Sequence, residues 1–231
     1  GGIERHRTRS IINSGTLDAS NPNGKGGTVQ VLGDKVGLTS TSVIDASGST
    51  GGGTVLVGGD FQGKNPAVKN ASATFVGSGA TIKADSTTLG DGGKVIIWSD
   101  EVTRYFGSIS AKGGAQGGNG GQVEVSGKQN LAFDGLVDVS SSLGDSGNIL
   151  LDPSTITIEN GAQGSQADDT LFVTPGSNPP GVLFTANGNN PIIISSGSIE
   201  ALAGSFSIQA NDSITINSAL NLANLNANNR T

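Results

Sequence analysis

The sequence predicts an all-β protein, a parallel β-helix built from coils of three short strands. Three observations point to this fold. A strand-opening motif recurs about every 27 residues, two further strand patterns follow it within each repeat, and turns rich in Gly, Ser, Asn and Asp separate the strands. In such a solenoid, equivalent residues of successive repeats stack ~4.8 Å apart and the hydrogen bonds run between coils.

The opening strand follows a pair of small residues that occurs five times, with its second member at positions 27, 53, 93, 121 and 147. The steps are 26, 40, 28 and 26 residues, and we interpret the long step as a loop insertion over residues 60–75. Because alternate residues of a strand share a face, the second and fourth residues after each pair are expected inside the coil. These inward residues are Val29 and Val31, Val55 and Val57, Val95 and Ile97, Val123 and Val125, and Ile149 and Leu151.

The second and third strands of the repeat carry their own patterns. The second ends in an aromatic residue, any residue and glycine, so we expect Phe75, Tyr105 and Phe133 to stack inside as an aromatic ladder. A buried Tyr105 hydroxyl then needs a hydrogen-bond partner. The third strand, as in "VIDAS" and "SISAK", predicts an inward aliphatic row (Leu17, Ile44, Ile82, Ile109, Val137) and, two residues on, an inward row of small residues (Ala19, Ala46, Ala84, Ala111, Val139).

A β-sandwich is the competing all-β fold, since strands at short, even spacing also suit it. The recurrence of a three-strand unit, rather than of single strands or hairpins, favours the solenoid. The glycine-rich stretch "KGGAQGGNGG" at 112–121 could be compared with a phosphate-binding loop. It lacks a following Lys-Ser/Thr and a helix, so we interpret it as a turn between coils.

Four segments are expected along the chain. Residues 1–14 are a basic N-terminal segment, 15–158 the repeat shaft, 159–190 a Pro/Gly/Asn-rich loop or capping excursion, and 191–231 C-terminal coils. Within the last segment, "SIEALAG" at 198–204 predicts a short helical turn. The inward candidates of the last coils are Ile208, Ile214 and Ile216.

Composition limits the possible partners. The net charge of −6 argues against nucleic acid or an anionic membrane surface. No cysteine is present, which excludes disulfides and thiolate zinc sites and suits a chain that crosses a membrane unfolded. No apolar run approaches the ~20 residues of a membrane-spanning helix, and no signal peptide is visible. Because the sequence contains no methionine, we expect it to be a mature piece or fragment of a longer protein.

One outward row of the opening strands stands out. Its members are Gln30, Leu56, Ile96, Glu124 and Leu150, so the adjacent Leu56 and Ile96 would form an apolar patch with Trp98 on the same face. Such a patch marks an interaction site or is covered by another part of the chain. We therefore treat Leu56, Ile96 and Trp98 as a candidate contact surface, with 60–75 and 159–190 as the two candidate covers.

The sequence shows no catalytic, metal or cofactor constellation. With His6 as the single histidine, neither a catalytic triad nor an imidazole metal site can form. Polysaccharide lyases share the β-helix fold and need carboxylates and a base on one face. Arg104 is the only mid-shaft arginine, and the acidic candidates are scattered: Asp60, Asp91, Asp100, Asp145 and Asp152. Aspartates beside glycine more often make turns than metal sites.

The combined motifs resemble a known family. "WSD", "FGSISAKGG" followed by "GGQVEVSGK", "LLDPSTITI" and "SIEAL" with "SIQANDSITIN" are similar to the filamentous-haemagglutinin-type exoproteins of Gram-negative bacteria, the passengers of two-partner secretion. The likeness covers roughly residues 15–220. It implies a right-handed parallel β-helix shaft, secreted through an outer-membrane pore partner and displayed at the cell surface, where such shafts serve adhesion, aggregation or the presentation of distal domains.

The family's secretion domain carries Asn-Pro-Asn motifs. Here "NPNG" at 21–24 lies where other repeats have plain turns, so we interpret it as a turn. The expectation is a non-catalytic, secreted segment of a cell-surface adhesin that contacts host-cell or neighbouring-cell glycans or proteins and needs no cofactor. A polysaccharide-active β-helix enzyme (a lyase or hydrolase) and a purely structural spacer remain the alternatives.

Overall fold

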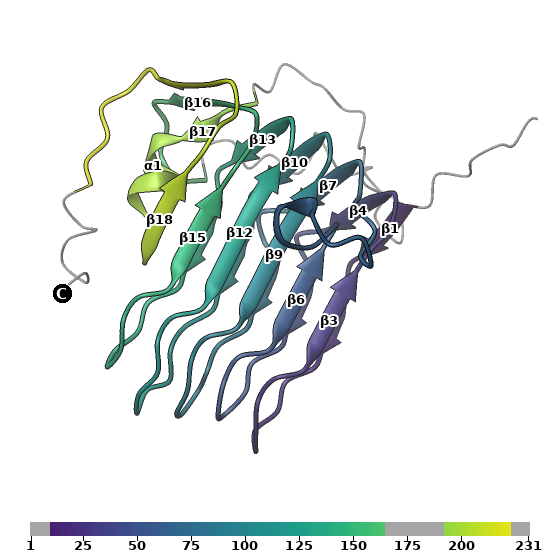
Figure 1. The fold of residues 1–231 in the computed structure, drawn as a ribbon, viewed down its shortest axis with the longest axis vertical. Coiled ribbons are helices and arrows are strands. Elements are labelled where there is room, and N and C mark those ends of the chain that lie inside the picture. Colours follow the sequence, from purple (N-terminus) through teal and green to yellow (C-terminus); the bar gives the residue numbers. More distant parts are fainter. Residues whose placement is uncertain (1–9, 165–191, 223–231) are drawn as a thin grey trace, which may run out of the picture.

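The chain winds through three all-parallel sheets and forms a parallel β-helix with three faces (Figure 1). The computed structural model describes residues 10–164 and 192–222. The opening strands make a six-stranded sheet of β3 (Thr28–Val31), β6 (Thr54–Val57), β9 (Lys94–Ser99), β12 (Gln122–Gly127), β15 (Asn148–Leu151) and β18 (Ser205–Ile208). The fold class predicted from the repeat is confirmed.

The second strands form an eight-stranded sheet, and the third strands form a five-stranded sheet. The former comprises β1 (Ser10–Asn13), β4 (Lys35–Leu38), β7 (Ala73–Val76), β10 (Val102–Tyr105), β13 (Asn130–Phe133), β17 (Ile194–Ser195), β16 (Thr155–Glu159) and β19 (Ser213–Ile216). The latter comprises β2 (Thr16–Asp18), β5 (Val43–Asp45), β8 (Thr81–Lys83), β11 (Ser108–Ser110) and β14 (Leu136–Asp138).

The small-residue pair before each opening strand has a steric cause. A Cβ at Gly52 would lie 1.9 Å from the carbonyl oxygen of Ala84, and one at Gly92 would lie 2.1 Å from that of Ala111. The chain closes each coil by bringing this corner against the end of the third strand, and no side chain fits between the two backbones. The recurring glycine therefore marks the place where the coil closes.

The side chains predicted to face inward on the opening and third strands do so. Val55 pairs with Val29 and with Val95, and the same register continues through Val123 to Ile149. These residues belong to one buried core that runs along the solenoid axis, together with the third-strand row that contains Ile44 and Ile82. At the first coil, Leu17 and Ala19 are only partly buried against that core.

The predicted aromatic ladder is confirmed for Tyr105 and Phe133 and is wrong for Phe75. Tyr105 pairs with Phe133, and their rings stack with centroids 5.2 Å apart and an interplanar angle of 20°. The Tyr105 hydroxyl donates to the carbonyl oxygen of Leu136 at 2.7 Å. Phe75 instead pairs with Arg104, while its neighbour Val76 occupies the inward position.

The register explains why Phe75 was misplaced. Four residues (77–80) connect β7 to β8, whereas two (106–107) connect β10 to β11. The glycine of "FVG" is thus not equivalent to the glycine of "YFG", and alignment on it shifts the strand by one residue. A shift of one residue reverses the face of every side chain. Phe75 consequently packs edge-on against Phe106, at a centroid distance of 6.1 Å, outside the core.

The segments near the ends differ in detail from the expected boundaries. Strand β1 lies inside the expected basic segment, of which residues 1–9 fall outside the described residues. Most of the expected excursion, 165–191, also falls outside them, so its predicted role as a cap or cover stays a prediction. The helix α1 (Ser196–Glu200) begins two residues earlier than expected, and its N-cap Ser195 makes no side-chain capping bond.

The last described coil is open. β19 pairs with β16 so that Ile214 and Ile216 are in phase with the buried Ile156 and Ile158. Their side chains are nevertheless exposed, because no further coil stacks on them within the described residues. Both predicted turns are present: Asn21 accepts from the backbone N–H of Asn23 at 3.1 Å, and 112–121 is a turn bridged between Gly114 and Gly117. None of the helices in the described residues is long and apolar enough to cross a membrane.

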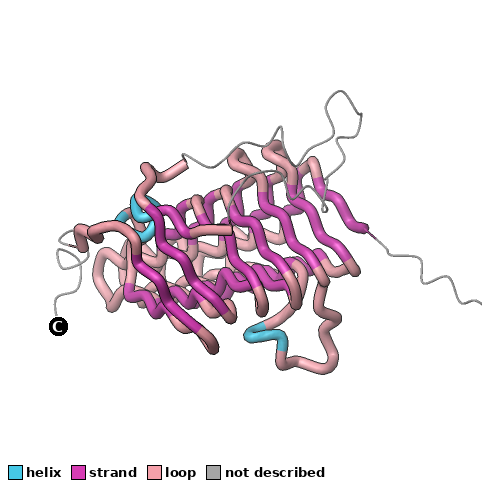
Figure 2. Tube along the Cα trace, turned by 90° about the horizontal axis from the view of Figure 1, so that it is seen from above, coloured by secondary structure: helices cyan, strands magenta, loops and turns pink. Residues whose placement is uncertain are grey.

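The insertion forms a loop on the outside of the solenoid. It runs over residues 58–72 between β6 and β7, ending before the expected residue 75 because β7 begins at Ala73. A short 3₁₀ turn, η1 (Phe61–Gly63), forms its tip, and the loop stands out from the flat coils in Figure 2. In Figure 1 the dark blue loop crosses the outer face of the sheet at β6 and β9.

Candidate binding site beside the insertion loop

The apolar patch predicted from the outward row lies beneath this loop. Leu56, Ile96 and Trp98 form a cluster separate from the core, packed against Phe61 and Val68 of the loop. They are 4%, 0% and 4% exposed, respectively. The placement outside the solenoid core is thus confirmed, and the loop is a cover of the patch; most of the other candidate cover lies outside the described residues. The loop removes these three side chains from solvent, as expected for a patch that another part of the chain covers; a partner contact at this face stays a prediction.

The loop folds around the carboxylate of Asp60. This group accepts hydrogen bonds from the backbone N–H of Phe61 at 2.7 Å, the amide of Asn65 at 2.8 Å and the ammonium group of Lys94 at 2.6 Å. Burial alone would raise the pKa of Asp60, but these donors outweigh it and lower the pKa to about 2. The charged Asp60 therefore fastens the loop to β9 through Lys94.

Glycine residues allow the loop to lie flat on the indole of Trp98. A Cβ at Gly59 or at Gly63 would come within 2.6 Å of ring atoms of Trp98. The indole N–H donates to Asp100 at 3.2 Å, and the Asn70 amide donates both to Asp100 at 3.1 Å and to the carbonyl oxygen of Gly63 at 3.0 Å. Trp98 is thus held on its face by backbone and at its edge by a polar network.

Gln62 connects the tip of the loop to the coils that lie two and three repeats further along the shaft. It is the one non-glycine residue with a positive φ (53°) among the described residues, a conformation that costs about 1–2 kcal/mol. Its backbone N–H donates to Oε2 of Glu124 at 2.9 Å, and its side-chain amide donates to Asp152 at 3.1 Å. Hydrogen bonds to two later coils therefore hold the left-handed backbone of Gln62 in place.

Glu124 is a fully buried carboxyl on the outer face. It continues the row after Ile96 on β12 and is 0% exposed under the loop tip. Burial, assisted by the nearby Asp152, raises the pKa of Glu124 to about 7, against smaller opposing effects of the Gln62 N–H, the Ser126 side chain and Lys94. Its Oε1 atom has no hydrogen-bond partner in the described part of the chain. A proton on this carboxyl avoids an uncompensated buried charge.

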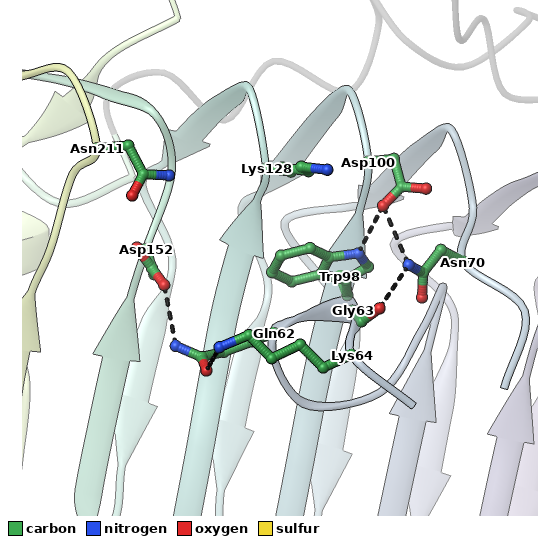
Figure 3. Close-up of a pocket in the computed structure, with 9 residues that line it drawn as sticks. All are labelled: Gln62, Gly63, Lys64, Asn70, Trp98, Asp100, Lys128, Asp152 and Asn211. Atoms are coloured by element: carbon green, nitrogen blue, oxygen red, sulfur yellow. Dashed lines mark hydrogen bonds between the residues drawn. The ribbon is translucent and has the colours of Figure 1, made fainter. Parts of the chain in front are cut away.

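A polar pocket of about 410 Å³ opens beside the loop tip (Figure 3). The Trp98 indole forms its wall, with the ammonium group of Lys128 and the carboxylate of Asp100 above the ring. Within the described residues that ammonium group makes no hydrogen bond or ion pair. The lining comes from the loop and from the ends of four successive coils: Gln62, Gly63, Lys64, Asn70, Trp98, Asp100, Lys128, Asp152 and Asn211.

The pocket suits a small, polar, uncharged or weakly charged ligand. Two ammonium groups and two carboxylates balance one another, and three side-chain amides offer both donors and acceptors. The volume lies within the ~300–1,000 Å³ of small-molecule sites. The two carboxylates already accept protein donors, so the groups most available to a ligand are Lys128 and the amide of Asn211.

The acidic candidates named from the sequence separate into two groups. Asp100 and Asp152 line the pocket, and Asp60 anchors the adjoining loop. Asp91 and Asp145 lie in the glycine-rich turns, where Asp91 accepts from the backbone N–H of Asn119 at 2.7 Å and Asp145 donates its own backbone N–H to the Asn119 side chain. These two stabilise turns between coils.

Arg104 does not join the pocket. It lies on β10 of another sheet, 6% exposed, and burial lowers the pKa of its guanidinium. In the described residues no group of three or more His, Cys, Asp or Glu side chains could hold a metal ion.

Most residues that line the pocket were not predicted from the sequence. Gln62, Asn70, Lys128 and Asn211 were not candidates, although Lys128 and Asp152 each directly follow an opening strand. The available signal was the insertion itself: a loop that leaves the end of one such strand passes the ends of its neighbours. The path of the loop, taken together with the polar residues at the ends of the following opening strands, predicts a polar site there.

The fold and the pocket define a β-helical solenoid with a loop-built polar site on one outer face. No known protein-family profile matches the chain, and comparison with curated proteins gives no significant match.

Proposed function

We propose that this chain is a segment of a secreted, cell-surface β-helical adhesin, a non-catalytic shaft that contacts glycans on host or neighbouring cells. The observation that carries the proposal is the pocket beside the loop, an amide- and ammonium-lined cavity on the side of a regular shaft. Sugar hydroxyls donate and accept at once, and the pocket supplies partners of both kinds.

The indole would serve as a wall for the ligand rather than as a stacking platform. Trp98 is 4% exposed, and the loop already covers its face. The ligand is therefore held mainly by polar contacts in competition with water, for which a dissociation constant on the order of millimolar is expected at one site. Firm attachment of a cell then requires many copies of the shaft acting together.

The remaining features of the proposal rest on the sequence likeness. A shaft of the filamentous-haemagglutinin type would leave a Gram-negative cell through an outer-membrane pore of the two-partner type. The absence of cysteine supports such a route, because no disulfide can form before passage. The net charge of −6 supports a partner other than nucleic acid.

One observation favours the polysaccharide-active enzyme as the second candidate. Glu124, with a pKa raised to about 7, has the property of a general acid in glycoside hydrolysis, and Asp152 lies near it. Against this, Glu124 does not line the pocket, because the backbone of Gln62 occupies the space over its carboxyl. A hydrolase or lyase would have to move the loop before a sugar could reach this acid.

The test is binding of the purified chain to an array of neutral and acidic glycans, followed by titration of the best ligand by NMR. Lys128→Ala should weaken binding at least about tenfold, as expected for loss of one charge-assisted hydrogen bond, and Asn211→Ala about fivefold, as expected for loss of a neutral one. The matched control is Lys83→Ala, which removes an exposed lysine from the third-strand sheet. Equal binding by all variants, or no glycan bound at all, rejects the pocket as a glycan site, and release of shortened sugars supports the enzyme.

A further inference from the structure

The loop tip rests on a buried acid. The backbone N–H of Gln62 is 2.9 Å from Oε2 of Glu124, and the other oxygen of that carboxyl has no partner in the described residues. The same glutamine lines the pocket and donates to Asp152. The hydrogen bond itself favours the ionised carboxyl and lowers the pKa of Glu124, so it is the burial under the loop that disfavours the charge. A movement of Gln62 away from the buried acid also moves a wall of the pocket.

We infer that Glu124 is a pH-sensitive latch: its protonated carboxyl holds the insertion loop closed over Trp98, and its ionisation releases the loop. This regulation rests on the proposed function only for its effect on ligand binding; the movement of the loop stands by itself. Glu124 acts through the position of Gln62 and is a positioning residue for the pocket.

The charged groups around Glu124 leave its ionised form poorly compensated. On β9, Lys94 is the nearest cation, but it is already paired with Asp60 at 2.6 Å. On the other side lies Asp152, the residue after β15. Its negative charge repels an ionised Glu124 and raises the pKa of Glu124. Lys64 of the loop donates to the Gln62 side chain, and Lys128 follows β12 in the pocket. Lys94, the cation that lowers the pKa of Glu124, is thus already paired, and an ionised Glu124 is poorly compensated while the loop is closed.

The sign of the pH effect follows from the two states. The carboxyl titrates near its ordinary value of 4.5 when the loop is open and near 7 when the loop is closed. Closure is therefore fully favoured below pH 4.5, weakens as the pH rises from 4.5 to about 7, and is constant above that. The difference between these values corresponds to a change in the opening equilibrium of about two orders of magnitude.

The loop can open without unfolding the shaft. The apolar contacts of its outer part, Phe61 and Val68 on Leu56, Ile96 and Trp98, form a cluster separate from the solenoid core, whereas Ala71 at its end belongs to that core and stays in place. The ladder hydrogen bonds of β9 and β12 run between coils and do not involve the loop. Such a small outer cluster is expected to open at a lower free energy than the core.

Hydrogen exchange of the loop amides tests the latch without any ligand. In the wild-type chain, the protection of the Gln62 amide, corrected for its intrinsic exchange rate, should fall about 100-fold between pH 5 and pH 8. In Glu124→Gln, which keeps the shape and an acceptor oxygen but cannot ionise, the protection should not change with pH. The matched control is Glu101→Gln, an exposed glutamate next to β10, which should keep the wild-type profile.

Two outcomes overturn the latch: protection that is constant with pH in the wild type, or an unchanged pH profile in Glu124→Gln. If Glu124→Gln does not fold, Asp152→Asn decides, because removal of the opposing carboxylate should move the midpoint to lower pH. An unmoved midpoint then overturns it. A pH-dependent loop together with no glycan bound at any pH would reject the proposed function and leave the latch intact.

Discussion

The backbone N–H of Gln62 donates to the carboxyl of Glu124, 62 positions along the chain, at 2.9 Å. This contact joins an insertion between the strands of one coil to the outer face of a coil two repeats away. It is made by a residue with a left-handed backbone and accepted by a carboxyl with no exposed surface. A left-handed backbone and a buried carboxyl are each unfavourable alone. The hydrogen bond between them offsets part of both costs.

Loop closure should be strongest in mildly acidic solution. Asp60 stabilises the closed loop above its ordinary pKa of 3.8, and that contribution is lost as the pH falls towards 2. The contribution of Glu124 is present below 4.5 and is lost as the pH rises through about 7. Acrylamide quenching of Trp98, the only tryptophan, should therefore pass through a minimum near pH 4 to 5. A quenching constant that rises or falls in one direction over this range would contradict the assignment.

Removal of the indole should free the loop and leave the shaft folded. Trp98→Ala deletes the largest side chain of the outer cluster, at a cost of about 3–5 kcal/mol. Trypsin should then cleave after Lys64 and Lys69 in the loop, while far-ultraviolet circular dichroism stays that of a β-helix. The control is Leu89→Ala, whose side chain is exposed in a turn. Loss of the β-sheet signal in Trp98→Ala would show that the cluster is not separable from the core.

A methyl group at a coil corner should destabilise the whole shaft. In Gly92→Ala the new Cβ would lie 2.1 Å from the carbonyl oxygen of Ala111, so the coil cannot close without a backbone shift. We expect a loss of about 3 kcal/mol or more in the free energy of unfolding. Gly15→Ala, which has nothing within 4 Å of its Cβ, should stay within ~0.5 kcal/mol of the wild type. Equal melting temperatures of the two variants would refute the steric account of the repeat.

The single tyrosine should not ionise in the folded chain near its ordinary pKa. Burial raises the pKa of Tyr105 well above 10.0, and its hydroxyl donates to the carbonyl oxygen of Leu136. Because the unfolded chain loses this proton first, stability should decline as the pH rises above 10. Absorbance at 295 nm should therefore show tyrosinate only together with alkaline unfolding. A reversible titration near pH 10 with the β-sheet signal intact would place the hydroxyl in solvent.

The predictions from sequence succeeded where the repeat is regular and failed where it is interrupted. Val95 and Val123 were placed correctly because coils of nearly equal length keep equivalent residues in register. Phe75 was placed wrongly because a corner longer by two residues follows its strand. The recurring pattern of an aromatic residue and a glycine was a poorer guide there than the spacing to the next strand.

The pocket could not be predicted from the sequence pattern alone, for a related reason. Asp100 and Asp152 could be named as acids, but no periodicity indicates that Asn70 of the loop and Asn211 of a later coil complete the same cavity. Nor does an isolated glutamate at an outward position suggest burial. Glu124 acquires its raised pKa only because a loop from two coils earlier excludes water from it.

The sequence by itself determined the three-faced solenoid, its inward rows and the apolar patch on one outer face, because side-chain alternation and a constant coil length are local properties. It also limited the cover of that patch to two segments. Only the tertiary structure decided that the insertion lies over Trp98, that Gln62 reaches Glu124 and that polar residues of four coils meet beside it. Desolvation and charge pairing depend on distances between residues remote in the chain, and those distances exist only once the coils have stacked.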